Sequence, residues 1–307
     1  MLTRVSYAQI LLPDFSLILL GYLVCRFTAL DRGLWSQVDR LVYYLLFPVL
    51  LFHSIVKSPL DLYAASGLIV AGVGLCCTGI AMAYALPHLP WLARHVDRRD
   101  HAASAQIAFR FNSFIALAIV ERLAGPTGLA LIAVLIGVCV PLLNVGAVWP
   151  MARHGQHGLL GELLRNPLVL ATTGGLAANA MGFAMPSWLE PTTGRIGAAT
   201  LALGLMAAGA GLQMGAMSQG KVLAAALLII RHLLLPLTAW GLSKLLALGS
   251  DQSTVLLVFS SMPTAASAYV LAARMGFNGA YVAGLITLST LLGMLSLPFA
   301  LGVLRTL

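Results

Sequence analysis

Long runs of apolar residues recur along the whole chain and constrain its fold more than any other feature. A helix needs about 20 apolar residues to cross the hydrocarbon core of a bilayer. Spans 1 to 10 of this kind are, in chain order, residues 10–25, 41–56, 64–86, 102–120, 128–149, 167–185, 196–214, 222–243, 254–273 and 279–303. The sequence therefore predicts an all-α polytopic membrane protein with ten transmembrane helices.

The composition supports a membrane protein and excludes an ordinary soluble one. Hydrophobic residues make up 60% of the chain and charged residues 9%, with a mean hydropathy of +0.93, whereas charged residues are about a quarter of soluble domains. The net charge of +8 does not indicate nucleic-acid binding, because the basic residues are spread over short loops. We therefore expect the lipid bilayer, and no nucleic acid, as a partner.

The basic residues of the loops predict the topology. The loops after odd-numbered spans hold ten Lys and Arg residues, and the opposite side holds six. Because positively charged loops stay cytoplasmic, both termini are predicted to face outward. Residues 28–40 are expected to form a solvated loop with Trp35 as an interfacial anchor, and residues 88–101 to lie on the cytoplasmic membrane surface.

A proline within a run of hydroxyl side chains interrupts span 9. Residues 260–268 read Ser-Ser-Met-Pro-Thr-Ala-Ala-Ser-Ala. Pro263 removes a backbone donor and clashes with the preceding turn, so the helix is expected to open there. Backbone groups freed at membrane depth must line protein or a wet cavity. The polar side chains that suit such a cavity are Ser260, Ser261, Thr264 and Ser267.

A second polar interruption lies in span 4 and contains Arg110, Asn112 and Ser113. Asn112 can cap the second half of a broken helix, and Pro263 is tolerated in the first turn of its own half-helix. Two half-helix N-termini that point inward offer unpaired N–H groups and partial positive charge, which favours a carboxylate. The alternative is that both segments are kinks packed against their neighbours.

The two interruptions are 151 residues apart, from Asn112 to Pro263, and this offset recurs. It also pairs Gly125 with Gly276 and Gly128 with Gly279, although it fails at Pro141, which falls opposite Leu292. Interrupted hydrophobic segments at corresponding positions of two halves point to a transporter's midplane site. We therefore predict an internal repeat, with residues 1–151 and 158–307 as its halves.

Further polar residues inside the spans each have two interpretations. Arg110 either faces a cavity, counter-ion or anionic ligand, or snorkels to the cytoplasmic surface. Asn144 lies three residues after Pro141 in span 5, where it either lines a cavity or bonds a neighbouring helix. Tyr269, beyond the interruption of span 9, either covers one side of a ligand or packs between helices.

The remaining ionisable residues are sparse. His53 follows Pro48, which is expected to kink span 2, and a hydrogen-bonded packing role is favoured for it over proton transfer. Arg231 lies about 14 Å inside span 8, too deep to snorkel easily, which favours a buried partner or a wet cavity. Only Asp14 and Glu121 among the carboxylates approach a span. Few groups are thus available for proton or sodium coupling, and transport driven by the membrane potential is credible.

No catalytic or metal chemistry is expected. The cysteines, Cys25, Cys76, Cys77 and Cys139, show no metal-ligand spacing, and the histidines of residues 88–101 are irregularly spaced. An intramembrane enzyme would need a nucleophile or metal constellation, and the spans contain neither a paired-His motif nor clustered carboxylates. We therefore predict a protein that is not an enzyme and uses no metal or cofactor.

Together, these features resemble the auxin efflux carrier family of membrane transporters. The matching stretches are residues 41–53, Asn112-Ser113 with Gly125, residues 141–145, Asn166-Pro167, and residues 262–265 with Gly276. The resemblance covers nearly the whole chain, and the order and spacing of the motifs carry it more than any single one. The chain departs from the family at Ile119, where a proline is usual. The break in span 4 is therefore expected to be milder than the break in span 9.

The resemblance implies two inverted five-helix repeats in which helices 4 and 9 are broken and cross. Spans 1, 2, 6 and 7 would form a scaffold that mediates a homodimer, and spans 3 to 5 and 8 to 10 a transport domain. The family includes bacterial members and the plant PIN proteins, and it moves organic anions such as auxin and, in bacteria, dicarboxylates such as malonate. For this chain the resemblance implies the bacterial inner membrane.

The predicted function is therefore secondary transport of organic anions by an elevator or rocking motion. The substrate carboxylate is expected at the crossover of helices 4 and 9. The predicted substrate-binding residues are Arg110, Asn112, Ser113, Asn144, Ser261, Pro263, Thr264, Ser267 and Tyr269. The alternative is an anion channel or a membrane sensor that uses the same crossover site.

Overall fold

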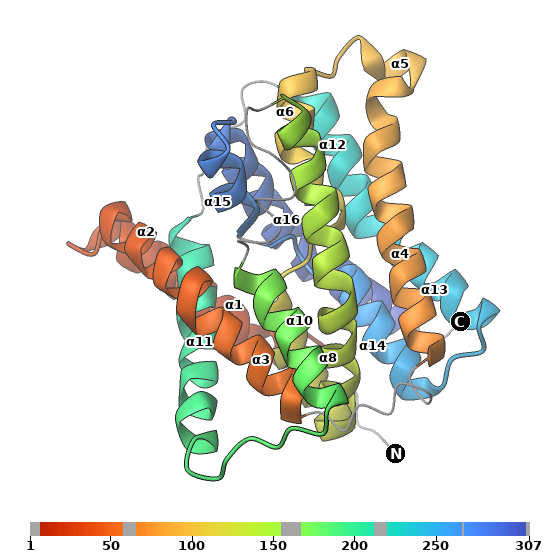
Figure 1. Cartoon of the computed structure of the whole chain (residues 1–307). Coiled ribbons are helices and arrows are strands. Elements are labelled where there is room, and N and C mark those ends of the chain that lie inside the picture. Colours follow the sequence, from red (N-terminus) through yellow and green to blue (C-terminus); the bar gives the residue numbers. More distant parts are fainter. Residues whose placement is uncertain (1–6, 58–65, 155–166, 212–219, 266, 305–307) are drawn as a thin grey trace.

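The computed structural model describes residues 7–57, 66–154, 167–211, 220–265 and 267–304, and the regular elements in these ranges are all helices (Figure 1). Within them, five stretches are long and apolar enough to cross a membrane: Arg32–Lys57, Ser66–His88, Thr127–Ala152, Lys221–Leu245 and Gly279–Gly302. The predicted class, an all-helical protein with several membrane-spanning helices, is confirmed at this level.

The elements follow the predicted spans closely. The first half contains α1 (Tyr7–Phe27), α2 (Arg32–Leu41), η1 (Val42–Leu46), α3 (Phe47–Lys57), α4 (Ser66–Ala85), η2 (Leu86–His88), α5 (Pro90–Ala93), α6 (Arg98–Ser104), α7 (Gln106–Phe109) and α8 (Ser113–His154). The second half contains α10 (Pro167–Ala180), α11 (Glu190–Ala210), α12 (Lys221–Ile229), η3 (Ile230–Leu234), α13 (Leu235–Leu245), α14 (Ser250–Ser261), α15 (Ser267–Arg274), α16 (Gly279–Phe299) and η4 (Ala300–Leu304).

The segment between spans 1 and 2 is largely helical, so the prediction of a solvated loop over residues 28–40 is wrong. Asp31 caps α2, because its side chain accepts a hydrogen bond from Leu34 N at 3.1 Å. α2 then continues through η1 into α3. Trp35 is buried in a cluster with Ala207 and Ala210, so its assignment as an interfacial anchor is also wrong.

Two helices widen into a π turn just before a proline. Phe47 N bonds to Val42 O before Pro48, and Leu235 N bonds to Ile230 O before Pro236. Proline lacks an N–H, and its ring clashes with the carbonyl four residues earlier. The wider π turn gives that carbonyl room, so the helix absorbs each proline as a local bulge.

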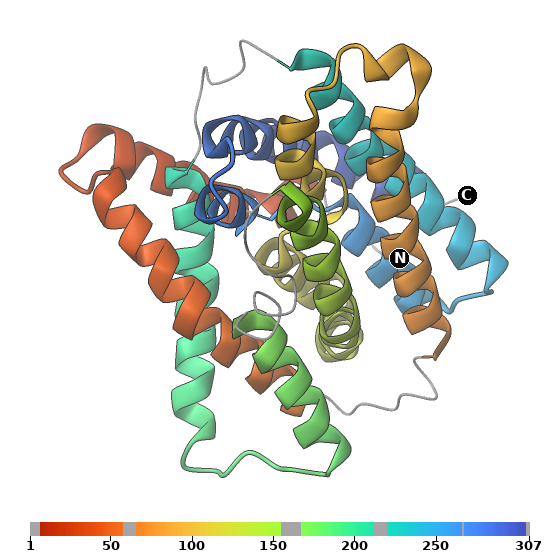
Figure 2. The same cartoon turned by 45° about the horizontal axis from the view of Figure 1, so that its top comes forward.

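The helices gather into two groups that lie on either side of α8 (Figure 1). In one group α1 packs on α11, and α3 packs on α10 and α11; in the other α14 packs on α13 and α4. Figure 2 shows α3, α10 and α11 extending away from the second group. A Cβ at Gly209 would lie 1.8 Å from Ile18 O, so only glycine allows this contact between α1 and α11.

Both predicted interruptions break a helix. In span 4 the break separates α7 from α8 at residues 110–112, and in span 9 it separates α14 from α15. The breaks touch, because Asn112 N donates a hydrogen bond to Pro263 O at 2.8 Å. The cap predicted for Asn112 is present, since its Oδ1 accepts from Ile115 N at 3.2 Å.

Two glycines paired by the 151-residue offset both have a positive φ angle. Gly125 has φ 55° and bends α8 sharply, and Gly276 has φ 75° in the turn after α15. Residues with a side chain rarely adopt such angles. Each broken span is thus followed by a bend at a glycine with positive φ.

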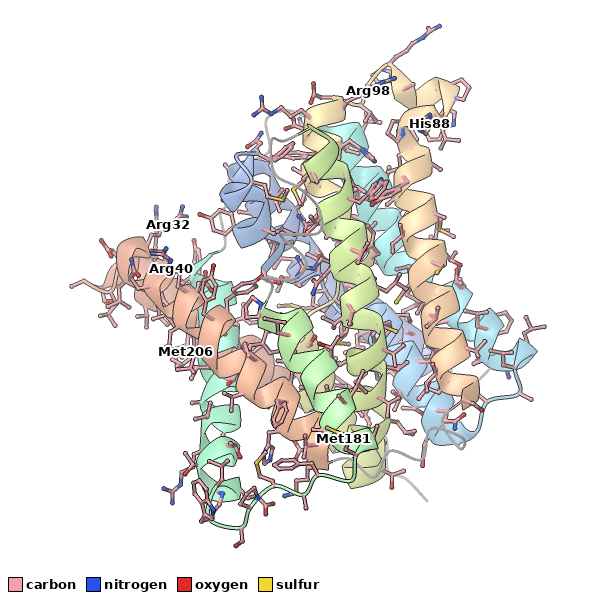
Figure 3. The ribbon with its side chains drawn as sticks, in the orientation of Figure 1. Arg32, Arg40, His88, Arg98, Met181 and Met206 are labelled. Carbon is pink, nitrogen blue, oxygen red and sulfur yellow. The ribbon has the colours of Figure 1, made fainter. Side chains whose placement is uncertain are left out.

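Labelled side chains mark the two ends of the molecule in Figure 3. His88 and Arg98 lie at the end with α5 and α6, Arg32 lies at the outer end of α2, and Met181 lies at the opposite end.

Candidate functional site

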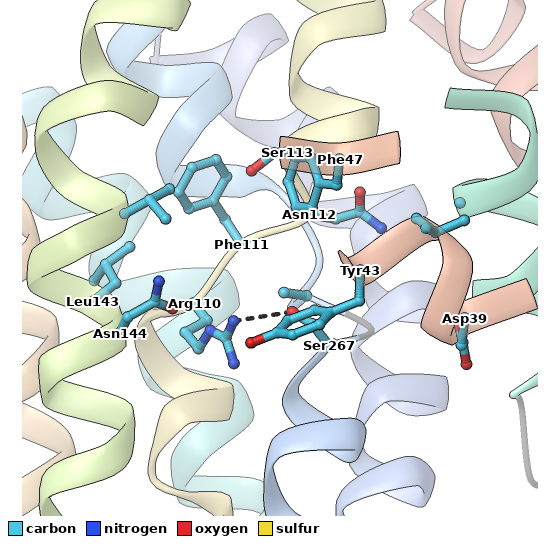
Figure 4. Close-up of a pocket in the computed structure, with 14 residues that line it drawn as sticks. Asp39, Tyr43, Phe47, Arg110, Phe111, Asn112, Ser113, Leu143, Asn144 and Ser267 are labelled. Carbon is cyan, nitrogen blue, oxygen red and sulfur yellow. Dashed lines mark hydrogen bonds between the residues drawn. The ribbon is translucent and has the colours of Figure 1, made fainter. Parts of the chain in front are cut away.

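A cavity of about 60 Å³ lies at the break in span 4 (Figure 4). Its lining comes from α2 to α3, the break, α8, α11 and the start of α15. The lining residues are Asp39, Val42, Tyr43, Phe47, Arg110, Phe111, Asn112, Ser113, Val140, Leu143, Asn144, Gly204, Ala265 and Ser267. Segments that are far apart in the sequence thus meet around one hollow.

Arg110 is the cation of this cavity. Its side chain does not snorkel: Arg110 is only 7% exposed, and it donates to Gln106 Oε1 and to Ser267 Oγ, each at 2.9 Å. Both partners are neutral, and no carboxylate pairs with Arg110 in the part of the chain that the structure describes. A buried charge without an ion pair is costly, so the cavity favours an anion.

Asn144 supplies a second donor beside Arg110 (Figure 4). It is 2% exposed, and its Nδ2 has no hydrogen-bond partner among the described residues. A buried donor left unpaired costs about 1–3 kcal/mol. Of its two interpretations, the structure shows the lining of a cavity. Pro141, three residues earlier, is not part of the lining.

Aromatic side chains form the apolar part of the lining. Tyr43 and Phe47 come from the helix that begins at Arg32, and Phe111 comes from the break, with its ring centroid 4.2 Å from that of Phe259. Sequence reasoning missed Tyr43 and Phe47 as site residues. Their spacing of four residues from each other, and of Tyr43 from Asp39, places all three on one helical face.

Asp39 also lines the cavity, and it was missed because residues 28–40 were expected to form a loop. Figure 4 shows its carboxylate pointing away from Arg110, with Tyr43 between them. The helical alternation of polar and apolar residues over Arg32–Leu41 was the signal that would have placed Asp39 on a helix.

Five of the predicted site residues line the cavity, namely Arg110, Asn112, Ser113, Asn144 and Ser267. The other four do not. Ser261 is fully buried and donates to Leu257 O at 2.7 Å, and Thr264 N donates to Ser289 Oγ at 3.0 Å. Pro263 is buried, with its ring against Gly293, and Tyr269 is 36% exposed on α15. The hydroxyls of Ser260 and Ser261 therefore bond within α14, and Thr264 Oγ1 has no hydrogen-bond partner among the described residues.

The other ionisable residues lie away from the cavity. Arg231 has the buried partners expected of it, because it donates to Met262 O at 2.6 Å and to Phe259 O at 3.3 Å. His53 is bonded to Thr193 Oγ1 at 2.8 Å. Glu121 is exposed, and the side chain of Asp14 lies outside the described residues. The described residues contain no group of His, Cys, Asp or Glu that could hold a metal ion.

Comparison with known proteins gives one match. A family model described as a membrane transport protein matches residues 150–301, which include the broken helix of span 9 and the Arg231 contacts. No curated protein matches the chain. The match confirms the resemblance drawn from the sequence motifs, and it lies in the half that carries Pro263. The membrane transport domain of the auxin efflux carrier family is therefore found at residues 150–301 of this chain.

Proposed function

We propose that this membrane transporter is a secondary carrier of organic anions, such as malonate or auxin-like acids. One observation carries the proposal: the buried Arg110 guanidinium and the unpaired Asn144 amide line the same cavity, and the hydrogen-bond partners of Arg110 are neutral. A carboxylate has two oxygens and accepts charge-assisted hydrogen bonds from such donors. Its binding would satisfy both groups at once.

The rest of the cavity suits the remainder of the anion. The N-terminus of α8, with Ser113 at its first position, adds partial positive charge to the lining. The rings of Tyr43, Phe47 and Phe111 offer apolar surface to an organic body. Binding would thus combine a charged anchor with an apolar wall.

The proposed architecture is ten spans in two inverted five-helix repeats, residues 1–151 and 158–307, whose broken helices 4 and 9 cross at the site. The bond between Asn112 N and Pro263 O and the matching positive φ angles of Gly125 and Gly276 support it. Spans 1, 2, 6 and 7 form the scaffold in this proposal, because α1 packs on α11, and α3 packs on α10 and α11. Spans 3 to 5 and 8 to 10 would move against it as the transport domain, by an elevator or rocking motion.

The family resemblance also supports a homodimer formed through the scaffold spans and a place in the bacterial inner membrane. The excess of basic residues in the loops after odd-numbered spans supports termini that face outward. In this proposal the scaffold stays fixed in the bilayer while the transport domain moves.

Counterflow in proteoliposomes tests the function. Purified protein reconstituted with internal malonate should take up labelled external malonate with saturable kinetics. Replacement of Arg110 by Met should lower uptake by about 100-fold or more, because charge-assisted hydrogen bonds from a buried guanidinium are lost. Arg110→Lys should retain part of it. Arg122→Met is the matched control, because Arg122 is exposed on α8.

Other outcomes assign other functions. Flux that rises linearly with the malonate gradient, without counterflow, would indicate an anion channel. Binding of malonate without flux would indicate a sensor. Neither flux nor binding for mono- and dicarboxylates, or uptake that Arg110→Met leaves unchanged, would overturn the proposed carboxylate site.

A further inference from the structure

The break in span 9 is held from behind by side chains of the two neighbouring spans. Four buried polar residues make these contacts, two from η3 and two from α16. We call them the clamp: Arg231, His232, Ser289 and Ser296. None of them lines the cavity, so the carboxylate site does not account for their presence in apolar spans.

Arg231 supplies donors that the broken helix lacks. Phe259 O is the carbonyl that the residue at position 263 would bond in a continuous helix, and proline has no N–H to give. Arg231 Nη2 donates to Phe259 O at 3.3 Å, and Arg231 Nε donates to Met262 O at 2.6 Å. The guanidinium therefore caps the C-terminal end of α14 and meets its partial negative charge.

His232 links the two serines of α16. Its Nε2 lies 2.9 Å from Ser289 Oγ, and its Nδ1 lies 2.8 Å from Ser296 Oγ. On the other side of the break, Thr264 N donates to Ser289 Oγ at 3.0 Å, and Ser296 Oγ donates to Ser261 O at 3.3 Å. The two serines thus reach the backbone before and after Pro263.

These contacts form one directed chain of hydrogen bonds. Ser289 Oγ accepts from Thr264 N, so its own proton is free to go to His232 Nε2. Nδ1 then carries the ring proton and donates to Ser296 Oγ, whose proton goes to Ser261 O. The direction assigns a neutral His232 ring with its proton on Nδ1.

We propose that Arg231, His232, Ser289 and Ser296 are positioning residues that keep the break of span 9 open whether or not a ligand is present. Together with Asn112, whose N–H meets Pro263 O, they satisfy the backbone groups of Phe259, Ser261, Met262, Pro263 and Thr264. A polar backbone at membrane depth persists only when such partners exist. The break is therefore built into the fold.

The clamp also bears on the charge preference of the site, an effect that rests on the proposed function. The end of α14 lies next to the contact between Asn112 and Pro263, and its carbonyls would oppose an anion there. Arg231 covers two of these carbonyls with a fixed positive charge. The donors of the first break then act on a carboxylate without that opposition.

Amide hydrogen exchange of the reconstituted, ligand-free protein tests the clamp without reference to transport. Arg231→Met and Ser289→Ala should each raise the exchange rate over residues 259–265 by about tenfold or more, because buried hydrogen bonds to the break are lost. Thr290→Ala is the matched control, since Thr290 neighbours Ser289 and donates only to Ile286 O. Arg231→Lys, which keeps the charge, should restore part of the protection.

Two further readouts separate positioning from general stability. Nitrogen-15 NMR of His232 should show a protonated Nδ1 and an unprotonated Nε2, and Ser289→Ala should change the Nε2 shift. If the carrier function holds, Ser289→Ala should raise the KM for malonate more than it changes kcat. Unchanged exchange over residues 259–265 in both Arg231→Met and Ser289→Ala would overturn the clamp. If Arg231→Met does not fold, Ser289→Ala decides alone.

The proposal and the carrier function fail separately. A wild-type protein that moves no carboxylate, with exchange that still rises in the clamp variants, would overturn the function and keep the clamp. Saturable malonate counterflow by the wild-type protein, with hydrogen exchange that does not change in the clamp variants, would keep the function and overturn the clamp.

Discussion

The two helix breaks meet but are built differently. In the first, residues 110–112, backbone atoms and the Asn112 cap make the bonds: Arg110 N bonds to Gln106 O, Asn112 N bonds to Pro263 O, and the Asn112 side chain caps α8. The side chains of this break turn into the cavity. In the second, around Pro263, side chains of spans 8 and 10 bond the backbone, and from this region only Ala265 and Ser267 line the cavity among the described residues.

Under the proposed function, the first break supplies the binding chemistry, and the second supplies the surrounding framework. The two breaks also differ in length, because three residues separate α7 from α8 and five separate α14 from α15. A short break can use its side chains for a ligand because its backbone needs little help. A longer break at membrane depth needs partners from its surroundings.

After Arg110, the largest effect at the first break is expected at Asn144. Replacement by Leu removes the unpaired Nδ2 donor, so malonate affinity should fall by about tenfold or more, while the ligand-free protein becomes more stable by about 1 kcal/mol. Isothermal titration and thermal unfolding in detergent measure the two quantities. A loss of stability would mean that Asn144 serves the fold instead of a ligand.

Two substitutions of Asn112 distinguish its role as a helix cap from its proposed role in ligand binding. Asn112→Ala removes the capping oxygen and the amide donor, so it should weaken malonate binding and cost about 0.5–2 kcal/mol of stability. Asn112→Ser keeps an oxygen that caps α8 but loses the amide donor, so stability should recover while binding does not. Equal affinity in the serine variant and the wild type would remove the Asn112 amide from the site.

The turns after the two breaks offer a matched pair of substitutions. Gly125→Ala and Gly276→Ala should each cost about 1–2 kcal/mol, since both glycines have positive φ and open space around them, so only backbone strain enters. The cost should be larger at Gly125, whose ψ of −149° is essentially restricted to glycine. Thermal unfolding of both variants measures these costs, and a neutral effect at either glycine would contradict the backbone strain expected there.

The smallest effect lies outside both breaks. Lys57 Nζ contacts Glu190 Oε1 at 2.5 Å, and this hydrogen bond, with the charge of Lys57, lowers the pKa of Glu190. The stability that the Lys57–Glu190 pair adds is present above the usual Glu pKa of about 4.3. It is lost as the pH falls through the lower pKa that Glu190 has in the folded protein. Glu190→Gln should flatten this part of a pH series of melting temperatures, and an unchanged slope would show that the pair is too exposed to matter.

The sequence predicted where the helices break, because proline and polar residues inside apolar runs have a direct backbone consequence. Asn112 and Pro263 were found in this way, and so was the offset that joins Gly125 to Gly276. The ten-span count, the inverted repeats and the crossing of helices stay predictions. They concern how helices sit in a bilayer and relate to one another, which periodicity along one chain does not fix.

The direction of side chains was beyond sequence reasoning. Ser261 and Thr264 are as polar as Ser267, yet the Ser261 hydroxyl bonds to Leu257 O of its own helix, Thr264 Oγ1 has no partner among the described residues, and only Ser267 lines the cavity. Two interpretations of Arg110 stayed open until Gln106 and Ser267 were seen beside it. Asp39 was missed for a different reason: a short, charged helix outside the apolar runs was taken for a connection.

The hydrogen bond from Asn112 N to Pro263 O joins main chain to main chain. No exchange of side chains at either position can delete its atoms, except proline in place of Asn112. Substitutions of the side chains that line the cavity can therefore change its chemistry while the main-chain contact between the two halves is kept. New substrate preferences could then evolve without any change in the backbone contact between the two breaks.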